Sequence, residues 1–256
     1  MSTANHIVVL TVPSPQSWVI VNAVAERFGP VTILTEEREP KRDLMRKRMR
    51  RQGFVTVLGQ IGFVLLQKRI EKRAQARIAE IISSMELNVE EPQRCEVIPV
   101  RSVNSMACRA ALAMLDPKVV LVIGTRIVGR ETLAAIKSPV INSHAGWNPK
   151  YRGQAGGYWS LASEDPEHAG VTVHLVDQGV DTGDILYREK FTATRADSFP
   201  TYYYIQAGAA RPLVIKALED ALAGSLKPFR GDPPSNQFYH PTLWGYLWTS
   251  WRKGIW

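Results

Sequence analysis

Two neighbouring stretches decide the fold of this chain: VINSHAGWNPKYRGQAGG at Val140–Gly157 and GVTVHLVDQGVDTGD at Gly170–Asp184. The first begins as a short apolar strand and runs through Asn142 and His144 into a loop rich in Pro and Gly. The second alternates apolar and polar residues, as a half-exposed strand does, and then turns to present Asp181. An amide, an imidazole and a carboxylate are therefore predicted to converge at strand ends, and each suits acyl chemistry.

The rest of the chain alternates apolar runs with helical patterns. Four more runs have the composition of buried strands: His6–Val12, Val31–Leu34, Cys95–Pro99 and Val119–Ile123. Their alternation with helices predicts an α/β fold with a Rossmann-like, open, mostly parallel sheet. The segment Ile185–Phe191 can return against the strand before it, which predicts an antiparallel hairpin at the C-terminal edge.

The expected ligand site lies at the carboxyl ends of these strands. The loop 124–129 leaves the strand Val119–Ile123, and the next strand, Pro139–Asn142, ends on Asn142 and is followed by His144. In an open α/β sheet, ligands bind outside the carboxyl ends of the strands, so these groups are expected to line one crevice. The turn after the first strand lacks a GxGxxG pattern, so dinucleotide binding has no support.

The segment 37–90 interrupts the alternation. Between Lys41 and Arg77, twelve Lys or Arg and two carboxylates give a net charge of +10, so the rest of the chain, within a total of +8, carries −2. A basic run, the apolar stretch Phe54–Leu66 and a helical pattern over Gln67–Met85 predict an inserted basic helical arm. We expect protein, either the body or a dimer partner, to cover the apolar stretch.

This pattern divides the chain into a catalytic domain, residues 1–225, with the arm at 37–90 inserted, and an aromatic C-terminal tail, residues 226–256. Cys95 and Cys108 have neither CxxC spacing nor a His cluster, which indicates free thiols. The N-terminal sequence is that of a first strand and not of a signal peptide, and no apolar run has the roughly 18 residues that span a bilayer. We therefore expect a cytoplasmic protein without a metal.

Taken together, the motifs resemble the folate-dependent formyltransferase family, which includes glycinamide ribonucleotide, methionyl-tRNA and sugar-nucleotide N-formyltransferases. That family has Asn-x-His followed by a Pro-x-aromatic-basic-Gly loop, and the matching residues here are Asn142, His144, Pro149, Tyr151, Arg152 and Gly153. Its later turn with an essential Asp is matched by Val180-Asp181-Thr182-Gly183. The resemblance covers roughly residues 95–225, and the size and motif set are most similar to the sugar N-formyltransferases.

The resemblance implies 10-formyltetrahydrofolate as formyl donor and a primary amine as acceptor. Asn142 would donate to the tetrahedral oxyanion, His144 would take the proton of the amine or steady the oxyanion, and Asp181 would orient the imidazole. Whether His144 or Asp181 is the formal base stays open. By resemblance, the pterin should lie against the backbone of six residues: Arg126, Ile127, Val128, Val176, Gly179 and Val180. The substrate side would be shaped by three others: Tyr151, Arg152 and Gly153.

The chain also departs from the family. Ala145-Gly146-Trp147-Asn148-Pro149 stands where the family has Ser-Leu-Leu-Pro after the His, and Thr11–Pro15 replaces the glycine loop that grips phosphate in the purine enzyme. Only 32 residues follow Gly224, too few for the extra domain of the tRNA enzyme. These differences favour an amino-sugar nucleotide as acceptor.

Several alternatives stay open. One is another amine acceptor, glycinamide ribonucleotide or methionyl-tRNA, and a second is a formyltetrahydrofolate hydrolase. A third, from another class, is an inactive core that carries a nucleic-acid-binding or membrane-binding arm. Nucleic acid is not the expected partner of the chain, whereas peripheral membrane contact through the arm and a homodimer remain open.

Overall fold

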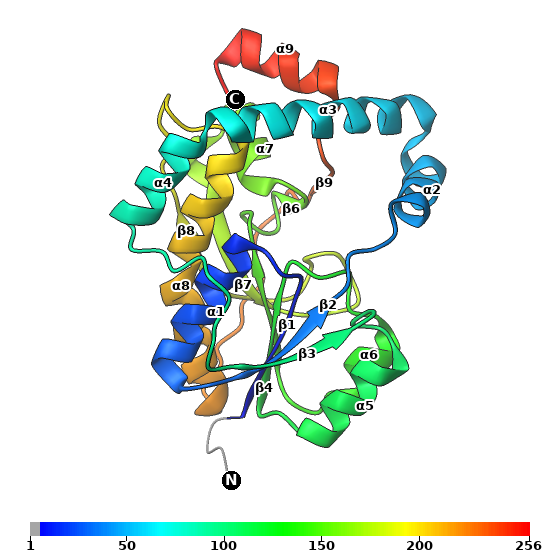
Figure 1. Cartoon of the computed structure of the whole chain (residues 1–256), viewed down its shortest axis with the longest axis vertical. Helices are drawn as coiled ribbons and strands as arrows, with labels where there is room; N and C mark the ends of the chain where they lie inside the picture. The colour runs from blue at the N-terminus through cyan, green and yellow to red at the C-terminus, as the bar shows by residue number, and fades with distance from the viewer. Residues whose placement is uncertain (1–5) are drawn as a thin grey trace.

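The computed structural model describes residues 6–256, and within them a seven-stranded sheet forms the centre of the molecule (Figure 1). Its strands, in spatial order, are β3 (Glu96–Val100), β2 (Thr32–Glu36), β1 (Ile7–Thr11), β4 (Val119–Ile123), β5 (Val140–His144), β7 (Gly170–Leu175) and β8 (Ile185–Lys190). The strands from β3 to β5 are parallel, whereas β7 pairs antiparallel with both β5 and β8. The predicted Rossmann-like sheet and its antiparallel hairpin are confirmed.

Helices cover both faces of this sheet: α1 (Pro15–Phe28), α5 (Met106–Leu115), α6 (Arg130–Ala135) and α8 (Phe199–Leu222). Alternate residues of β1 point to opposite faces. Ile7 and Val9 pack in one apolar cluster with α1 and α8, and Val8 and Leu10 pack in another with α5 and α6. The central strands are buried on both faces, which explains why the sequence shows them as continuous apolar runs.

Strand β5 extends two residues further than the sequence pattern predicts. It ends at His144, so His144 lies within the strand and not beyond it, together with Asn142, which was predicted to end the strand. The pairing with β7 accounts for the extension, because Asn142 lies opposite His174 and His144 lies opposite Thr172. Since successive side chains of a strand alternate, Asn142 and His144 share one face of the sheet.

The segment 37–90 forms the predicted helical arm, as three helices: α2 (Lys41–Gln52), α3 (Phe54–Arg73) and α4 (Gln75–Ser84). Gly53, with φ 83°, joins α2 to α3 in a conformation that favours glycine. Leu66, Ile70 and Ala74 are partly buried, and Ile78 and Ile81 are buried, in an apolar cluster between the arm and α8. In Figure 1 the arm crosses above the carboxyl ends of the strands.

The C-terminal tail adds a strand and a helix to the molecule. Strand β9 (Gln237–Phe238) pairs with β6 (Arg152–Gly153), and helix α9 (Leu243–Lys253) lies along α3 (Figure 1). Between β6 and β7 come α7 (Gly156–Ala162) and a 3₁₀ turn at Pro166–His168. Fully buried Tyr246 of α9 packs against Phe63, so the tail and the arm share one core.

The expected cover of the apolar stretch Phe54–Leu66 is present on one face only. Val57, Gly59, Gln60 and Phe63 are buried, whereas a second set is exposed: Phe54, Val55, Leu58, Ile61, Val64 and Leu65. The body of the chain therefore does not cover the face opposite Phe63, because α8 and α9 reach only one side of α3, and cover of that face by a dimer partner stays a prediction. Within residues 6–256, no helix is both long enough and apolar enough to cross a membrane.

Candidate active site

Asp181 is the centre of the candidate active site. It lies in the turn between β7 and β8 with φ 51°, in the left-handed region of the backbone. Its Oδ1 accepts a hydrogen bond from Asn142 Nδ2 at 3.2 Å and lies 3.5 Å from His174 Nε2. Its Oδ2 accepts from the Gly153 N–H at 3.0 Å and lies 3.5 Å from His144 Nδ1. One carboxylate thus joins four segments of the chain.

The surroundings of Asp181 favour its charged form. Burial opposes the charge, but the positive charge of a protonated His144 and the Gly153 N–H hold the pKa of the Asp181 carboxyl well below its usual range. The carboxylate is therefore ionised across the physiological pH range. A permanent negative charge at this point can orient an imidazole or accept a proton through water.

Both side-chain hydrogens of Asn142 have partners in the fold. Its Nδ2 lies 3.0 Å from His174 Nε2, in addition to its bond to Asp181. The opposite orientation of the amide would place its oxygen against the Asp181 carboxylate, so this neighbour fixes the nitrogen on the Asp181 side. The amide is thereby held in one orientation, with its donors in the site.

The imidazole of His144 is buried between two acceptors. Its Nε2 lies 3.1 Å from the Tyr151 backbone oxygen, and its Nδ1 lies 3.5 Å from Asp181 Oδ2. A doubly protonated ring satisfies both contacts, because each nitrogen then donates. Gly146 makes the arrangement feasible, since a Cβ there would come within 2.5 Å of His144 Nε2.

His174 belongs to this site, and sequence reasoning missed it. Its ring is buried, its Nδ1 lies 2.7 Å from the Leu175 backbone oxygen, and its Nε2 faces Asn142. When Nδ1–H donates to that carbonyl, Nε2 of the neutral ring is free to accept from the Asn142 amide. The alternation of Val171–Leu175 could have revealed this residue, because it places His174 on the face opposite Val171 and Val173.

The loop after β5 is anchored by its own polar contacts. The Tyr151 hydroxyl donates to Asp165 Oδ2 at 2.8 Å, and burial and this bond raise the pKa of Tyr151 to about 12. Asp165 also contacts Lys150 and His168, each at 2.7 Å. The Tyr151 ring stacks on Phe238. Its backbone oxygen is therefore the part of Tyr151 that faces the site, and the prediction that it shapes the substrate side rests on that atom.

Arg152 and Gly153 connect this loop to the turn that holds Asp181. The Arg152 guanidinium donates to the Val180 backbone oxygen at 2.6 Å and to Ser235 Oγ at 2.8 Å. Gly153 has φ 89°, and a Cβ on it would come within 2.4 Å of the Phe238 backbone oxygen. The two residues therefore position Asp181, and their predicted contact with substrate stays a prediction.

The six residues predicted to hold a pterin lie in two loops. Several of their backbone groups are already bonded within the chain: Arg126 N–H to Glu36, Ile127 C=O to Asn104, Val176 N–H to Val140, Gly179 N–H to Asp177 and Val180 C=O to Arg152. Val128 and Val176 pack in the same apolar cluster, which brings the two loops together. Within residues 6–256, no protein group bonds the N–H or C=O of Val128.

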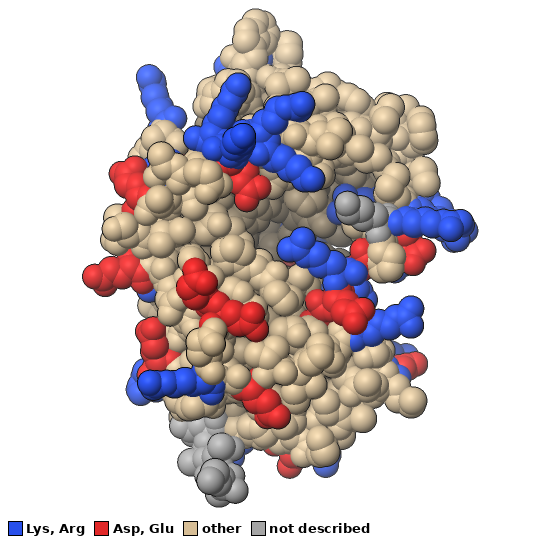
Figure 2. All heavy atoms as spheres, in the orientation of Figure 1, with Lys and Arg blue, Asp and Glu red and all other residues tan. Residues whose placement is uncertain are grey.

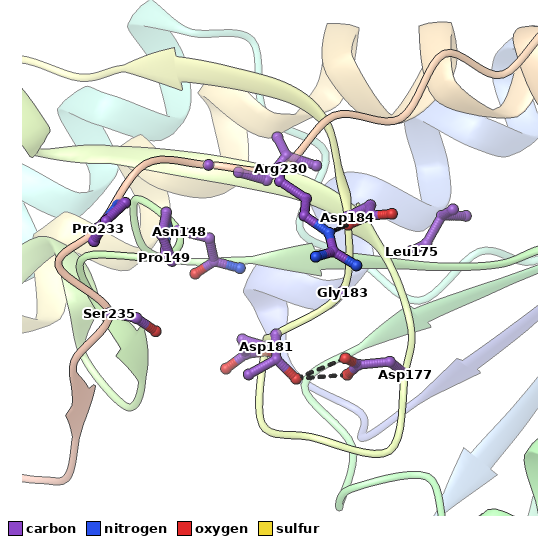
Figure 3. Close-up of a pocket in the computed structure, with 13 residues that line it drawn as sticks. Asn148, Pro149, Leu175, Asp177, Asp181, Gly183, Asp184, Arg230, Pro233 and Ser235 are labelled. Atoms are coloured by element: carbon purple, nitrogen blue, oxygen red, sulfur yellow. Dashed lines mark hydrogen bonds and ion pairs between the residues drawn. The ribbon is translucent and has the colours of Figure 1, made fainter.

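Asp181 lines a cavity of about 520 Å³ (Figure 3). Asp177 and Asp184 border it from the β7–β8 turn, Arg230 from the tail, and Asn148 and Pro149 from the loop after β5. A second cavity of about 410 Å³ lies between the arm and the sheet, and Arg126 lines it with Arg38, Arg46, Lys47, Arg50 and Arg101. Arg126 of the loop 124–129 thus lines a different cavity from Asp181, and Asn142 and His144 line neither of the two.

Asn148 is a buried polar residue of the first cavity wall. Its backbone N–H donates to Thr172 Oγ1 at 3.0 Å, but neither side-chain polar atom has a hydrogen-bond partner among the described residues. A buried amide without partners lowers stability by about 1–3 kcal/mol. The residue stands where the related motif has an apolar side chain, and it places an amide in the cavity wall that a water molecule or a ligand can satisfy.

A family model described as formyl transferase matches residues 4–218. A methionyl-tRNA formyltransferase from Pelotomaculum thermopropionicum is 34% identical over 111 residues, which are 43% of this chain and 35% of that protein. The match therefore covers less than half of this relative's length.

Two solved structures have the same fold. A sugar N-formyltransferase from Shewanella sp FDAARGOS_354 superposes with a TM-score of 0.56 at 17% identity, over 91% of this chain and 76% of that one. HypX from Aquifex aeolicus, in complex with tetrahydrofolic acid, gives 0.54 at 14% identity, over 91% of this chain and 30% of that one. These likenesses concern the fold alone.

The family model spans every strand from β1 to β8, and the Asn142, His144 and Asp181 side chains lie within it. Because the match extends over most of the sequence, and the sheet has the topology that the motifs predict, the chain belongs to the formyl transferase family.

Proposed function

We propose that this chain is an N-formyltransferase that moves the formyl group of 10-formyltetrahydrofolate to the primary amine of an amino-sugar nucleotide. The observation that carries the proposal is the gathering of Asn142, His144 and His174 around the ionised Asp181. Amide and imidazole donors beside a permanent carboxylate match the needs of acyl transfer, which develops an oxyanion and releases a proton.

The folate supplies a formyl carbon, which the amine attacks, so that its carbonyl becomes an oxyanion before the bond to the folate nitrogen breaks. His144 donates to that oxyanion through one ring nitrogen, once the oxyanion replaces one of the two present partners of the ring, the Tyr151 oxygen and Asp181. Asn142 adds its amide, once substrate replaces one of its present partners. The proton of the amine leaves through a water molecule that the Asp181 carboxylate orients, and a proton returns to the folate nitrogen as that nitrogen leaves.

In the proposed folate site within residues 6–256, one residue, Val128, has free backbone groups that could bind the edge of a pterin. The Val128 N–H and C=O offer one donor and one acceptor, and Val176 lies beside Val128 in the same apolar cluster. Half-exposed Ile127 adds an apolar contact surface. A flat heterocycle with polar edges suits such a combination. The Arg126, Gly179 and Val180 groups that already bond within the chain would shape this site and not bind the ring.

The cavity beside Asp181 is the proposed site for the acceptor. Its volume of about 520 Å³ is in the range of small-molecule sites. Asp177 and Asp184 can accept hydrogen bonds from sugar hydroxyls, and Arg230, whose side chain is 92% exposed, can pair with phosphate. The charged groups of the wall are three carboxylates, Asp177, Asp181 and Asp184, and one cation, Arg230, whose Nε lies 3.6 Å from Asp184 Oδ1. The carboxylates suit sugar hydroxyls and an amine, and a phosphate suits the Arg230 edge of the cavity.

A second candidate acceptor is methionyl-tRNA. The observation in its favour is the 34% identity with a methionyl-tRNA formyltransferase, which is higher than the identity with either solved structure. The basic cavity at the arm, with six Lys or Arg and three carboxylates, could contact a nucleic-acid backbone. The two acceptors share the chemistry at Asp181 and differ in what binds the rest of the molecule.

Purified protein, 10-formyltetrahydrofolate and separate acceptors distinguish these functions. Release of tetrahydrofolate with an amino-sugar nucleotide, and a product heavier by one formyl group in mass spectrometry, is the expected result. Turnover with methionyl-tRNA alone would replace the proposed acceptor by the second candidate. Release of formate without any amine would identify a hydrolase, and the proposal would then be wrong.

A further inference from the structure

The face of α3 opposite Phe63 carries an apolar stripe in contact with solvent. Its residues are spaced by four, three and four positions, so they lie on one side of the helix: Phe54 (68% exposed), Leu58 (54%), Ile61 (37%) and Leu65 (56%). Lys68 and Lys72 continue the same spacing to the end of the helix. The exposed side of α3 is thus apolar for three turns and basic for the last two.

Helix α9 carries a second exposed apolar stripe beside the first. It consists of large side chains on one side of the helix: Trp244 (50% exposed), Leu247 (44%), Trp248 (59%) and Trp251 (72%). The helices are in contact, since a Cβ on Gly59 would come within 2.5 Å of Trp244 Cη2. The two stripes and the lysines Lys68 and Lys72 are called the α3–α9 face below.

Cations surround this face. Within residues 6–256, no carboxylate forms an ion pair with Lys68, Arg69, Lys72 or Arg73 at one end of α3, or with Arg50 and Arg51 before its other end. Figure 2 shows Lys and Arg clustered over one half of α3, next to an uncharged surface over its other half. On α9, the Arg252 guanidinium lies 5.6 Å from the Trp248 ring.

We propose that the α3–α9 face docks the protein on an anionic lipid surface. Exposed apolar patches of this kind mark interaction sites. Interfacial helices bury Leu, Phe and Trp among acyl chains while their Lys and Arg remain at the headgroups. Tryptophan favours the boundary between lipid and water, and a polybasic segment is attracted by anionic headgroups. The α3–α9 face combines all three features, and no helix that crosses the bilayer is required.

The charges argue against two other occupants. In a second copy paired face to face, the cations at both ends of α3 would meet cations in either orientation of the helices, a costly arrangement without anions between them. A nucleic acid would neutralise the same cations but leave Phe54, Leu58 and Trp251 in water. Only a surface that is anionic outside and apolar inside matches both parts of the face.

Flotation of the full chain with vesicles tests the proposal. We expect binding to phosphatidylcholine vesicles that contain phosphatidylglycerol and little binding to phosphatidylcholine alone. Replacing Leu58, Leu65 and Trp248 together by Ser should lower partitioning at least about tenfold. Lys68→Gln with Lys72→Gln should lower it on the order of 30-fold, and high salt should mimic that change.

A matched control separates this face from other exposed apolar residues. Met106→Ser with Met114→Ser removes two side chains of α5 that are 79% and 82% exposed, and it should change partitioning by less than about twofold. Equal binding to neutral vesicles, or none to anionic ones, would overturn the proposal. So would a dimer in sedimentation that the Leu58 and Trp248 changes dissociate, or RNA binding that those changes leave intact.

Discussion

The site around Asp181 and the α3–α9 face differ in whether their side chains find partners within the fold. In the first, Asn142, His144 and His174 are drawn into one largely buried network in which their side-chain nitrogens have protein partners. In the second, Leu58, Trp251 and their neighbours remain in solvent. A buried polar group without a partner lowers stability, so the network is closed within the fold. Within the described part of the chain, no other element of the fold covers the exposed apolar face, so only an external partner can remove it from water.

Among the proposed variants, Asp181→Asn should produce the largest loss of turnover. The amide would retain the shape of the side chain but lose the charge that faces His144, so turnover should fall by about 10³-fold while the fold is kept. Steady-state kinetics measures the turnover, and circular dichroism checks that the fold is kept. Asp116→Asn is the matched control, since Asp116 also has positive φ and lies at the exposed end of α5. An unchanged rate and pH profile would remove Asp181 from the mechanism.

The two sides of α3 offer the sharpest test of stability. Phe63→Ala should lower the free energy of unfolding by about 3–5 kcal/mol, because Phe63 is fully buried against Phe199 and Tyr246. Phe54→Ala, on the exposed side of the same helix, should change it by less than about 0.5 kcal/mol. Denaturant unfolding in the absence of lipid makes the measurement. Similar losses for both variants would show that the exposed side is covered in solution.

Asn142→Ala and His144→Ala should each reduce turnover by at least about 10²-fold, since each removes a donor proposed for the oxyanion. Folate binding should survive, because the proposed folate contacts come from backbone groups of other residues. Kinetics and calorimetric titration with a folate separate the two effects. A near-normal rate for either variant would contradict its proposed role.

His174→Gln should have a smaller effect, on the order of tenfold in kcat, because His174 acts through Asn142 and not on the substrate. The proposed role is to hold the Asn142 amide, so KM should change little. His174→Asn, with a shorter reach, should lose more activity than His174→Gln. If both variants change KM and leave kcat intact, His174 would instead contact the substrate.

Neutralising the arm should have the smallest effect on the chemistry. The variant replaces five cations of α2 by Gln: Arg46, Lys47, Arg48, Arg50 and Arg51. It should keep the fold and change the rate on a small amine by less than about threefold. The apparent affinity for a nucleotide-linked acceptor should fall more, because Arg46, Lys47 and Arg50 line the basic cavity. A large loss of rate on the small amine would place the arm in the catalytic centre.

Much of the fold follows from local sequence. The buried runs of β1 and β4 are apolar at every position except Thr11, and they predicted a parallel sheet because such strands contact helices on both faces. The Asn-x-His and Asp motifs predicted three residues of the site, since function requires their chemical types at fixed spacing. The charge of the arm was also evident from the sequence, because it is concentrated between Lys41 and Arg77.

Only the tertiary structure decided the rest. His174 entered the site through the register between β7 and β5, and neither strand specifies that register alone. The fate of Phe54–Leu66 was equally undetermined, because an apolar helix becomes buried only where another element reaches it, and α8 and α9 reach one side of α3. Local sequence fixes which groups a segment carries, whereas long-range packing decides which of them meet and which remain in water.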